Sequence, residues 1–191
     1  MTLIPLTYFG PISWWKILLA NNDIVFDIYE NYIKQTYRNR CSILSANGLL
    51  NLSIPVKKTN GNHTVFKDIK VENNQNWQHI HYKAIMSAYK ASPFYDYYID
   101  DIQHIWTTKY DYLLDVCLES INIISKITKT TPKFILSDSY ITANSDDSDF
   151  RKSQKYILES DFTVNPYTQV FSDRFNFISD LSILDKIFNT N

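Results

Sequence analysis

The sequence has few of the glycines from which many nucleotide-binding loops are built. Only 3 of its 191 residues are glycine, and neither the P-loop motif nor G-x-G-x-x-G occurs. The serine-nucleophile motif G-x-S-x-G and the zinc-protease motif H-E-x-x-H are absent as well. These absences argue against a glycine-built phosphate cradle and against the enzyme classes that carry those motifs.

Cysteine is equally scarce, with Cys41 and Cys117 far apart in the chain. Two cysteines are too few for a disulfide framework or a zinc site, and this usage is typical of a reducing cytoplasm. Cys117 lies in an apolar helical stripe, so we expect it to be buried and unreactive. His79 and His81 are two residues apart and lie on different helix faces, which does not suit a shared metal. We predict no metal and no cofactor.

Neither sign of charge dominates, because 19 basic and 20 acidic residues give a net charge of −1. No global field draws the protein to nucleic acid or to an acidic membrane surface, so an anion site must be local. No apolar stretch approaches the roughly 18 residues of a membrane-spanning helix. The apolar N-terminus is broken by Pro5, Gly10 and Pro11 and is interpreted as folded structure, not as a signal peptide. We expect a cytoplasmic protein without a nucleic-acid partner, in an oligomeric state that the sequence leaves open.

Hydrophobic residues make up 45% of the chain and aromatic residues 15%, which is typical of a folded globular protein. A chain of this length buries roughly 70% of the surface that its unfolded form exposes. We predict one α/β domain over residues 1–191, with a mixed sheet, flanking helices and a helix-rich middle segment.

The first thirty residues predict a strand, a helix and a second strand. The strands cover Leu3–Leu6 and Ile24–Tyr29, the helix covers Ile12–Ala20, and we expect the two strands to be neighbours in one sheet. Further along, Asn47-Gly48 predicts a hairpin between 41–44 and 49–56.

The remaining elements follow from periodicity and from breaker residues. Helices are predicted from Trp77 to before Pro93, over Tyr97–Trp106, over Tyr110–Lys126, and over Leu181–Phe188 with Ser179 or Asp180 as its N-cap. Strands are predicted over Phe66–Val71 and Phe134–Leu136. The polar stretch Thr142–Asp149 predicts a mobile loop, because it has almost no apolar residue to bury.

The densest polar segment, Glu30–Arg40, follows the C-terminal end of the second predicted strand. Open α/β sheets bind their ligands just outside such strand ends. In an extended chain Arg38 and Arg40 point to the same side and Asn39 to the other, so the two guanidinium groups could grip a phosphate or carboxylate. The alternative is that these residues are solvated loop charges or surface salt bridges.

Three further positions have two interpretations each. His81 lies on the apolar face of its helix, one turn after Trp77, and is either an acid–base group or a hydrogen-bonded core histidine. Asp185 is flanked by apolar residues in the last helix, so it either points into a cleft or belongs to a solvated face. The pair Asp149 and Arg151 either closes over a ligand or anchors the preceding loop.

Several motifs together resemble the WbqC-like protein family, in its short branch from Bacteroidetes-type bacteria. The resemblance covers nearly the whole chain, and its most specific parts are Tyr37-Arg38-Asn39-Arg40 and the ending Leu181–Asn189. The other matching residues are Tyr8–Pro11, Glu30–Gln35, Asn47-Gly48, Pro55-Val56, Trp77, His81, Ala88-Tyr89, Ser92–Phe94, Asp138–Tyr140, Asp149–Arg151 and Tyr167–Phe171. The sequence departs from the family at two places. It has Ile4-Pro5-Leu6 where the longer branch has His-Gln-Pro, and Asn176–Ser182 where the family usually has Gly-Phe-x-Pro-Asn-Leu-Ser.

Members of this family occur in O-antigen and other surface-polysaccharide gene clusters, and some are described as glycine or aminoacyl transferases. The resemblance therefore implies a metal-free transferase of aminoacyl or acyl type that acts on a small anionic sugar precursor, such as a nucleotide sugar. It leaves open whether the chain is an enzyme. The alternative is a non-catalytic binding or scaffold protein whose 14 tyrosines and 4 tryptophans line a recognition surface.

For the transferase hypothesis we predict one cleft that holds both substrate and acid–base groups. His81 or Glu30 would remove a proton from the attacking amine or hydroxyl. Glu30 and Asp185 would also balance the charge of the two arginines. The predicted substrate-binding residues are Tyr8, Gln35, Arg38, Asn39, Arg40 and Asp185.

Overall fold

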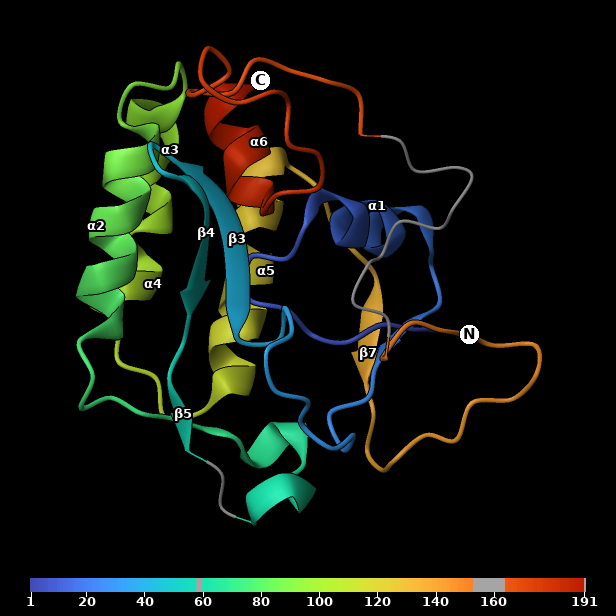
Figure 1. The fold of residues 1–191 in the computed structure, drawn as a ribbon. Helices are drawn as coiled ribbons and strands as arrows, with labels where there is room; N and C mark the ends of the chain where they lie inside the picture. The colour runs from blue at the N-terminus through green and yellow to red at the C-terminus, as the bar shows by residue number, and fades with distance from the viewer. Residues whose placement is uncertain (58–59, 153–163, 191) are drawn as a thin grey trace.

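The computed structural model describes residues 1–57, 60–152 and 164–190 (Figure 1). A parallel sheet is formed by two segments near the N-terminus and two segments within residues 134–149. β1 (Thr2–Leu3) and β2 (Ile24–Phe26) run parallel, which confirms the predicted neighbours. β7 (Phe134–Leu136) and β8 (Ser148–Asp149) complete the order β7-β2-β1-β8. Both N-terminal strands are shorter than predicted; Pro5 lacks the N–H that a central strand needs, so β1 ends before it.

α1 (Ile12–Ala20) connects β1 to β2 and has the predicted bounds. Its first turn is capped from a distant part of the chain, because the carboxylate of Asp180 accepts hydrogen bonds from the Ser13 amide at 2.7 Å and the Ser13 hydroxyl at 2.8 Å. The prediction that Ser179 or Asp180 caps the last helix is wrong. The hydroxyl of Ser182 does so by accepting from the Leu184 amide.

The predicted hairpin is present as β3 (Arg40–Ser45) and β4 (Gly48–Ser53), which pair antiparallel. Gly48 has φ +100°, a backbone conformation that favours glycine. β5 (Val56–Lys57) pairs with β6 (Lys70–Val71). The strand predicted over Phe66–Val71 is therefore wrong in its first part, where the 3-10 turn η2 (Phe66–Asp68) follows η1 (Gly61–His63).

The helix-rich middle of the chain covers the hairpin and the parallel sheet (Figure 1). α2 (Trp77–Tyr89) and α6 (Ile183–Asn189) both contact β3. The single helix predicted over Tyr97–Trp106 is wrong, because α3 (Tyr95–Ile102) and α4 (His104–Thr107) are separate helices. α5 (Leu113–Thr128) passes behind the hairpin and contacts α3. The mixed α/β class with a helix-rich middle is confirmed.

The apolar core takes side chains from the sheets and from these helices. Cys41 and Cys117 are both buried within it, as predicted for Cys117. The mobile loop predicted over Thr142–Asp149 is wrong at its end, where Ser148 and Asp149 form β8. Backbone pairing with β1, and not apolar burial, orders these two residues. No helix in the described part of the chain has both the length and the apolar composition needed to cross a bilayer.

Candidate functional site

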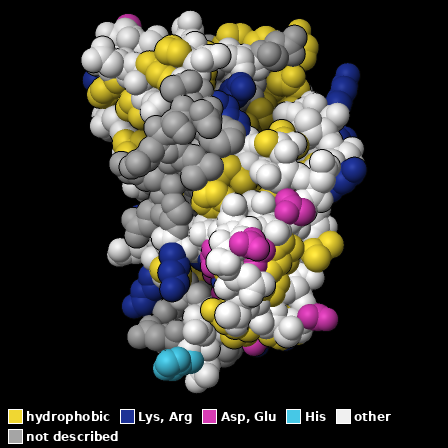
Figure 2. Space-filling model, turned by 90° about the vertical axis from the view of Figure 1, so that its right-hand side faces the viewer, with side chains coloured by type: hydrophobic (Ala, Val, Ile, Leu, Met, Phe, Trp, Pro, Cys, Tyr) yellow, Lys and Arg dark blue, Asp and Glu magenta, His cyan; other side chains and the backbone are white. Residues whose placement is uncertain are grey.

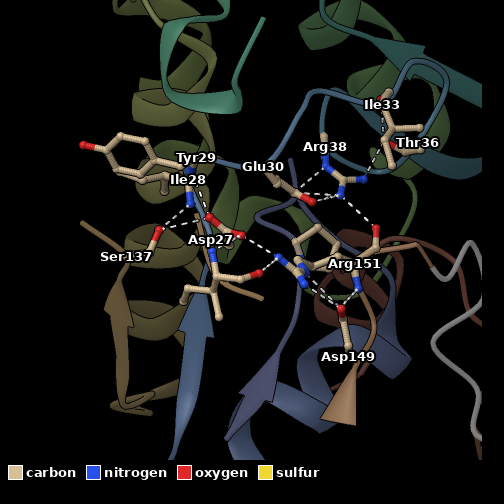
Figure 3. Close-up of polar contacts among 12 residues, drawn as sticks. Asp27, Ile28, Tyr29, Glu30, Ile33, Thr36, Arg38, Ser137, Asp149 and Arg151 are labelled. Atoms are coloured by element: carbon tan, nitrogen blue, oxygen red, sulfur yellow. Dashed lines mark hydrogen bonds and ion pairs between the residues drawn. The ribbon is translucent and has the colours of Figure 1, made fainter. Parts of the chain in front are cut away.

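A buried cluster of charges lies where the strands of the parallel sheet end (Figure 3). Asp27 directly follows β2, and Arg151 follows β8. Arg151 donates from Nε and Nη2 to Asp149 at 2.9 and 2.7 Å and from Nη1 to Asp27. The hydroxyl of Ser137, just after β7, also donates to Asp27. The cluster therefore ties three strand ends together.

Arg38 and Glu30 form the second half of this cluster. The guanidinium of Arg38 donates from Nε and Nη2 to the two carboxylate oxygens of Glu30 at 2.8 and 2.7 Å, and from Nη2 to the backbone oxygen of Arg151 at 2.8 Å. Both side chains are buried, with 2% and 8% of their surface exposed. Burial raises the pKa of Glu30, and the charge of Arg38 opposes that rise.

The prediction that Arg38 and Arg40 point to the same side is wrong. It assumed an extended chain, but the Asn39 amide donates to the Thr36 oxygen, so residues 36–39 turn. Arg38 consequently enters the core, whereas Arg40 begins β3 and is half-buried.

The cluster carries more negative than positive charge. Its three carboxylates, on Asp27, Glu30 and Asp149, exceed the two guanidinium groups of Arg38 and Arg151 by one negative charge. On the face seen in Figure 2, acidic side chains lie in the lower half together with Lys or Arg side chains at its left. An anion at this sheet edge would therefore meet net negative charge. The contacts favour the interpretation in which Asp149 and Arg151 anchor the preceding loop, here residues 138–150.

Three of the predicted substrate-binding residues come together elsewhere, in a pocket of about 350 Å³ that we call the Arg40 pocket. It contains two cations, Lys34 and Arg40, and no Asp or Glu among the described residues that line it. Its volume lies within the range typical of small-molecule sites. Its lining residues are Tyr32, Lys34, Gln35, Asn39, Arg40, Ser53 and Val56.

The hairpin fixes one wall of the Arg40 pocket. Arg40 and Ser53 are directly opposed in the β3–β4 register, and the Arg40 Nε donates to the Ser53 hydroxyl at 3.2 Å. Asn39 donates from Nδ2 to the Ile54 oxygen at 2.8 Å, while its own Oδ1 is buried and has no hydrogen-bond partner among the described residues. Asn39 therefore carries a buried acceptor that no described residue satisfies, and other atoms of the same residue line the pocket.

Hydrogen bonds hold the backbone on the other side of the pocket. The Tyr37 oxygen accepts from the Tyr8 amide at 3.0 Å, and the Arg38 oxygen accepts from the Cys117 thiol at 3.2 Å. Gln35 has φ +57°, a left-handed conformation that costs energy for a residue with a Cβ and that occurs often at functional sites. The backbone of this wall is thus held at Tyr37 and Arg38, between the lining residues Gln35 and Asn39.

Tyr8 and His81 lie in the core behind this wall and meet each other directly. The Ser53 oxygen, 3.3 Å from His81 Nε2, can only accept, so Nε2 carries the proton. His81 Nδ1 then accepts from the Tyr8 hydroxyl at 3.0 Å, which in turn accepts from the Trp106 indole at 2.8 Å. Burial lowers the pKa of His81 to about 4. Both ring nitrogens of this neutral histidine are therefore engaged within the protein.

Asp185 lies in a third polar group, at the start of α6. Its carboxylate accepts from the hydroxyls of Tyr89 at 2.9 Å and Tyr167 at 2.5 Å, and from the Gln169 amide at 2.9 Å. Burial raises its pKa. Neither arginine is among its hydrogen-bond partners, so the prediction that Asp185 balances their charge is wrong. Among the described residues, Glu30 is the acid that pairs with Arg38.

Sequence reasoning missed Asp27, Tyr32, Lys34 and Ser53. Asp27 carried a signal, because it is a single acid at the end of an apolar strand. Ser53 could have been found by counting the hairpin register outward from Gly48 to the position opposite Arg40. The aromatic surface of the scaffold alternative lacks tryptophan, because all four tryptophans are buried: Trp14, Trp15, Trp77 and Trp106.

Within residues 1–57, 60–152 and 164–190, no group of three or more His, Cys, Asp or Glu side chains could hold a metal ion. Comparison with protein-family models gives a match to the WbqC-like protein family over residues 7–159. No curated protein and no solved structure matches the chain.

Proposed function

Because the chain belongs to the WbqC-like protein family, we propose that it is a cytoplasmic transferase that acts on an anionic sugar precursor in surface-polysaccharide or O-antigen biosynthesis. The transferred group would be aminoacyl or acyl, and the precursor a nucleotide sugar bound in the Arg40 pocket. The single observation that carries the proposal is a pocket with two cations and no lining acid in the described chain.

The pocket residues suit the parts of such a ligand. The guanidinium of Arg40 can donate two parallel hydrogen bonds to a diphosphate, and the ammonium of Lys34 adds a point charge. The unpartnered Oδ1 of Asn39 would accept from a sugar hydroxyl, and the amide of Gln35 can both donate and accept.

We assign positioning roles to the two predicted acid–base groups. His81 holds the Ser53 carbonyl at the pocket wall and has no ring nitrogen left for a substrate proton. Glu30 holds Arg38, whose neighbours Asn39 and Arg40 line the pocket. In this proposal the pocket contributes binding and orientation, which convert an encounter of two substrates into a reaction between oriented groups.

Isothermal titration calorimetry with UDP-, GDP- and dTDP-sugars tests the binding step. A hydrogen bond to a charged group contributes about 1.5–3 kcal/mol, so Arg40→Gln should weaken the binding nucleotide sugar by about 10- to 100-fold. Arg174→Gln is the matched control, because it removes the same charge from an exposed residue outside the pocket, and it should change affinity by less than about twofold. Equal losses in the two variants, or no binding of any nucleotide sugar, would refute the assignment.

The transfer step is tested separately by mass spectrometry. The nucleotide sugar that binds is incubated with the protein and an aminoacyl or acyl thioester, whose thiol is the leaving group. A product heavier by one aminoacyl or acyl group, formed by wild type and strongly reduced in Arg40→Gln, would support the transferase. Tight binding without any such product would favour the non-catalytic alternative.

A further inference from the structure

A second hollow, of about 440 Å³, lies between α1, α6 and the C-terminal end of α5. It shares no lining residue with the Arg40 pocket. We call it the α1/α6 groove, and its lining residues are Ile12, Trp15, Lys16, Leu19, Tyr98, Ile127, Thr128, Lys129, Ile183, Lys186, Ile187 and Thr190.

Most of the lining is aliphatic or aromatic. α1 contributes Leu19, which is exposed, and α6 contributes Ile187 from its buried side. Tyr98 adds a half-buried ring from α3. Such a lining accepts an alkyl chain, because burying apolar surface from both partners is favourable.

The charged residues of the groove all have the same sign. Lys16, Lys129 and Lys186 line it, and no Asp or Glu of the described chain does so. Lys16 already interacts with Asp180, whose pKa it helps to lower against the effect of burial. The ammonium groups of Lys129 and Lys186 have no ion pair within the described residues. The two exposed ammonium groups are thus available to an anion.

Trp15 lines the groove and carries a buried donor. Only 3% of the residue is exposed, and its indole N–H has no hydrogen-bond partner among the described residues. A buried donor without an acceptor bears an uncompensated desolvation cost. A ligand oxygen that reached this N–H after a small side-chain adjustment would remove the cost.

We propose that the α1/α6 groove binds a single-chain lipid phosphate. The alkyl chain lies along the aliphatic lining, and the phosphate lies against Lys129 and Lys186. The groove combines an apolar wall with two cations that have no ion pair in the described chain. This combination favours a ligand with both an alkyl chain and a phosphate over a neutral lipid or a free anion. The proposal rests on residues outside the Arg40 pocket and does not depend on the proposed transferase function.

The test uses decyl phosphate below its critical micelle concentration and the full chain labelled with ¹⁵N. The Trp15 indole signal in the ¹H–¹⁵N spectrum is assigned by its loss in Trp15→Phe. We expect decyl phosphate to shift this signal in a saturable way, decanol to bind at least tenfold more weakly, and inorganic phosphate at the same concentration to leave it unchanged.

Charge variants test the head-group contacts. Lys129→Gln with Lys186→Gln should weaken decyl phosphate binding at least tenfold. Lys83→Gln with Lys90→Gln removes the same charge from two exposed positions, one on α2 and one directly after its last residue, and should change the affinity by less than twofold. Equal affinity for decanol, an equal response to inorganic phosphate, equal effects of the two double variants, or no response to decyl phosphate would each overturn the proposal.

Discussion

Arg38 and Arg40 are two residues apart, yet the structure predicts opposite responses to substitution. Arg38→Met keeps much of the apolar stem but leaves the Glu30 carboxylate, 8% exposed, without its cation. Removing one partner of a buried ion pair costs about 3–5 kcal/mol. We expect Arg38→Met to lower the free energy of unfolding by about that amount at pH 7.

Arg40→Met is the matched control, because it is the same change of side chain at a half-buried position. Within the described part of the chain, the Arg40 side chain donates a hydrogen bond to the hydroxyl of Ser53 and forms no ion pair with a buried acid. Its loss should change the free energy of unfolding by about 0.5 kcal/mol. The same variant should abolish much of the proposed nucleotide-sugar binding.

The cost of Arg38→Met should also depend on pH. Burial raises the pKa of Glu30, and loss of Arg38 raises it further, since the charge that opposed the rise is gone. Folded Glu30 then binds a proton more tightly than unfolded Glu30, whose pKa is about 4.3. Stability falls as pH rises between these two pKa values, by at most about 1.4 kcal/mol per pH unit. The deficit of the variant should therefore be largest at pH 8 and smaller at pH 5.

Urea denaturation, followed by tryptophan fluorescence and far-UV circular dichroism, measures both effects at pH 5, 6.5 and 8. Coincident transitions by the two probes would establish two-state unfolding. Similar losses for Arg38→Met and Arg40→Met, or a loss for Arg38→Met that does not change with pH, would refute the buried-pair argument.

Three further expectations concern the core and the charged cluster. Arg151→Met leaves Asp27 buried without its cation and should lower the free energy of unfolding by about 3–5 kcal/mol. Lys126→Gln breaks an exposed ion pair and should lower it by at most about 1 kcal/mol. Equal losses of stability in urea denaturation would contradict the role of the buried cluster. In an NMR titration, His81 should have a midpoint near pH 4, because burial lowers its pKa to about 4. The stability of the protein should fall as the pH drops below about 6.5. A titration midpoint near about 6.5 would instead mean that the ring is solvated. Cys117 should resist thiol reagents in the native protein, since it is buried and burial raises its pKa; labelling as fast as in urea would count against this.

Local signals in the sequence were sufficient for much of the fold. Pro11 and the apolar run after it predicted α1 with its observed bounds, and the Asn47-Gly48 pair located the hairpin. Elements that depend on distant partners were missed. Ser148 and Asp149 have no strand-like sequence and become β8 only because β1 offers an unpaired edge. Asp180 caps a helix 167 residues away, which no local pattern can indicate.

The candidate site was predictable only where it depends on local sequence and not on distant parts of the chain. The density of polar residues around Gln35, Asn39 and Arg40 pointed to the segment that lines the Arg40 pocket. The direction of the Arg38 side chain depends on the turn over 36–39 and on the location of Glu30 in space, so an extended-strand assumption placed it wrongly. Lys34 is a single exposed lysine in sequence, and only the fold brings it to the same pocket as Arg40.

The central claim is that the Arg40 pocket holds the phosphates of a nucleotide sugar. A crystal structure of the protein with the nucleotide sugar that binds in calorimetry tests this claim most directly. The account predicts diphosphate oxygens within hydrogen-bond distance of the Arg40 guanidinium and a sugar hydroxyl donating to Asn39 Oδ1. A ligand bound instead at the sheet edge, with its phosphates on Arg38 or Arg151 and the ion pairs to Glu30 and Asp27 broken, would contradict it.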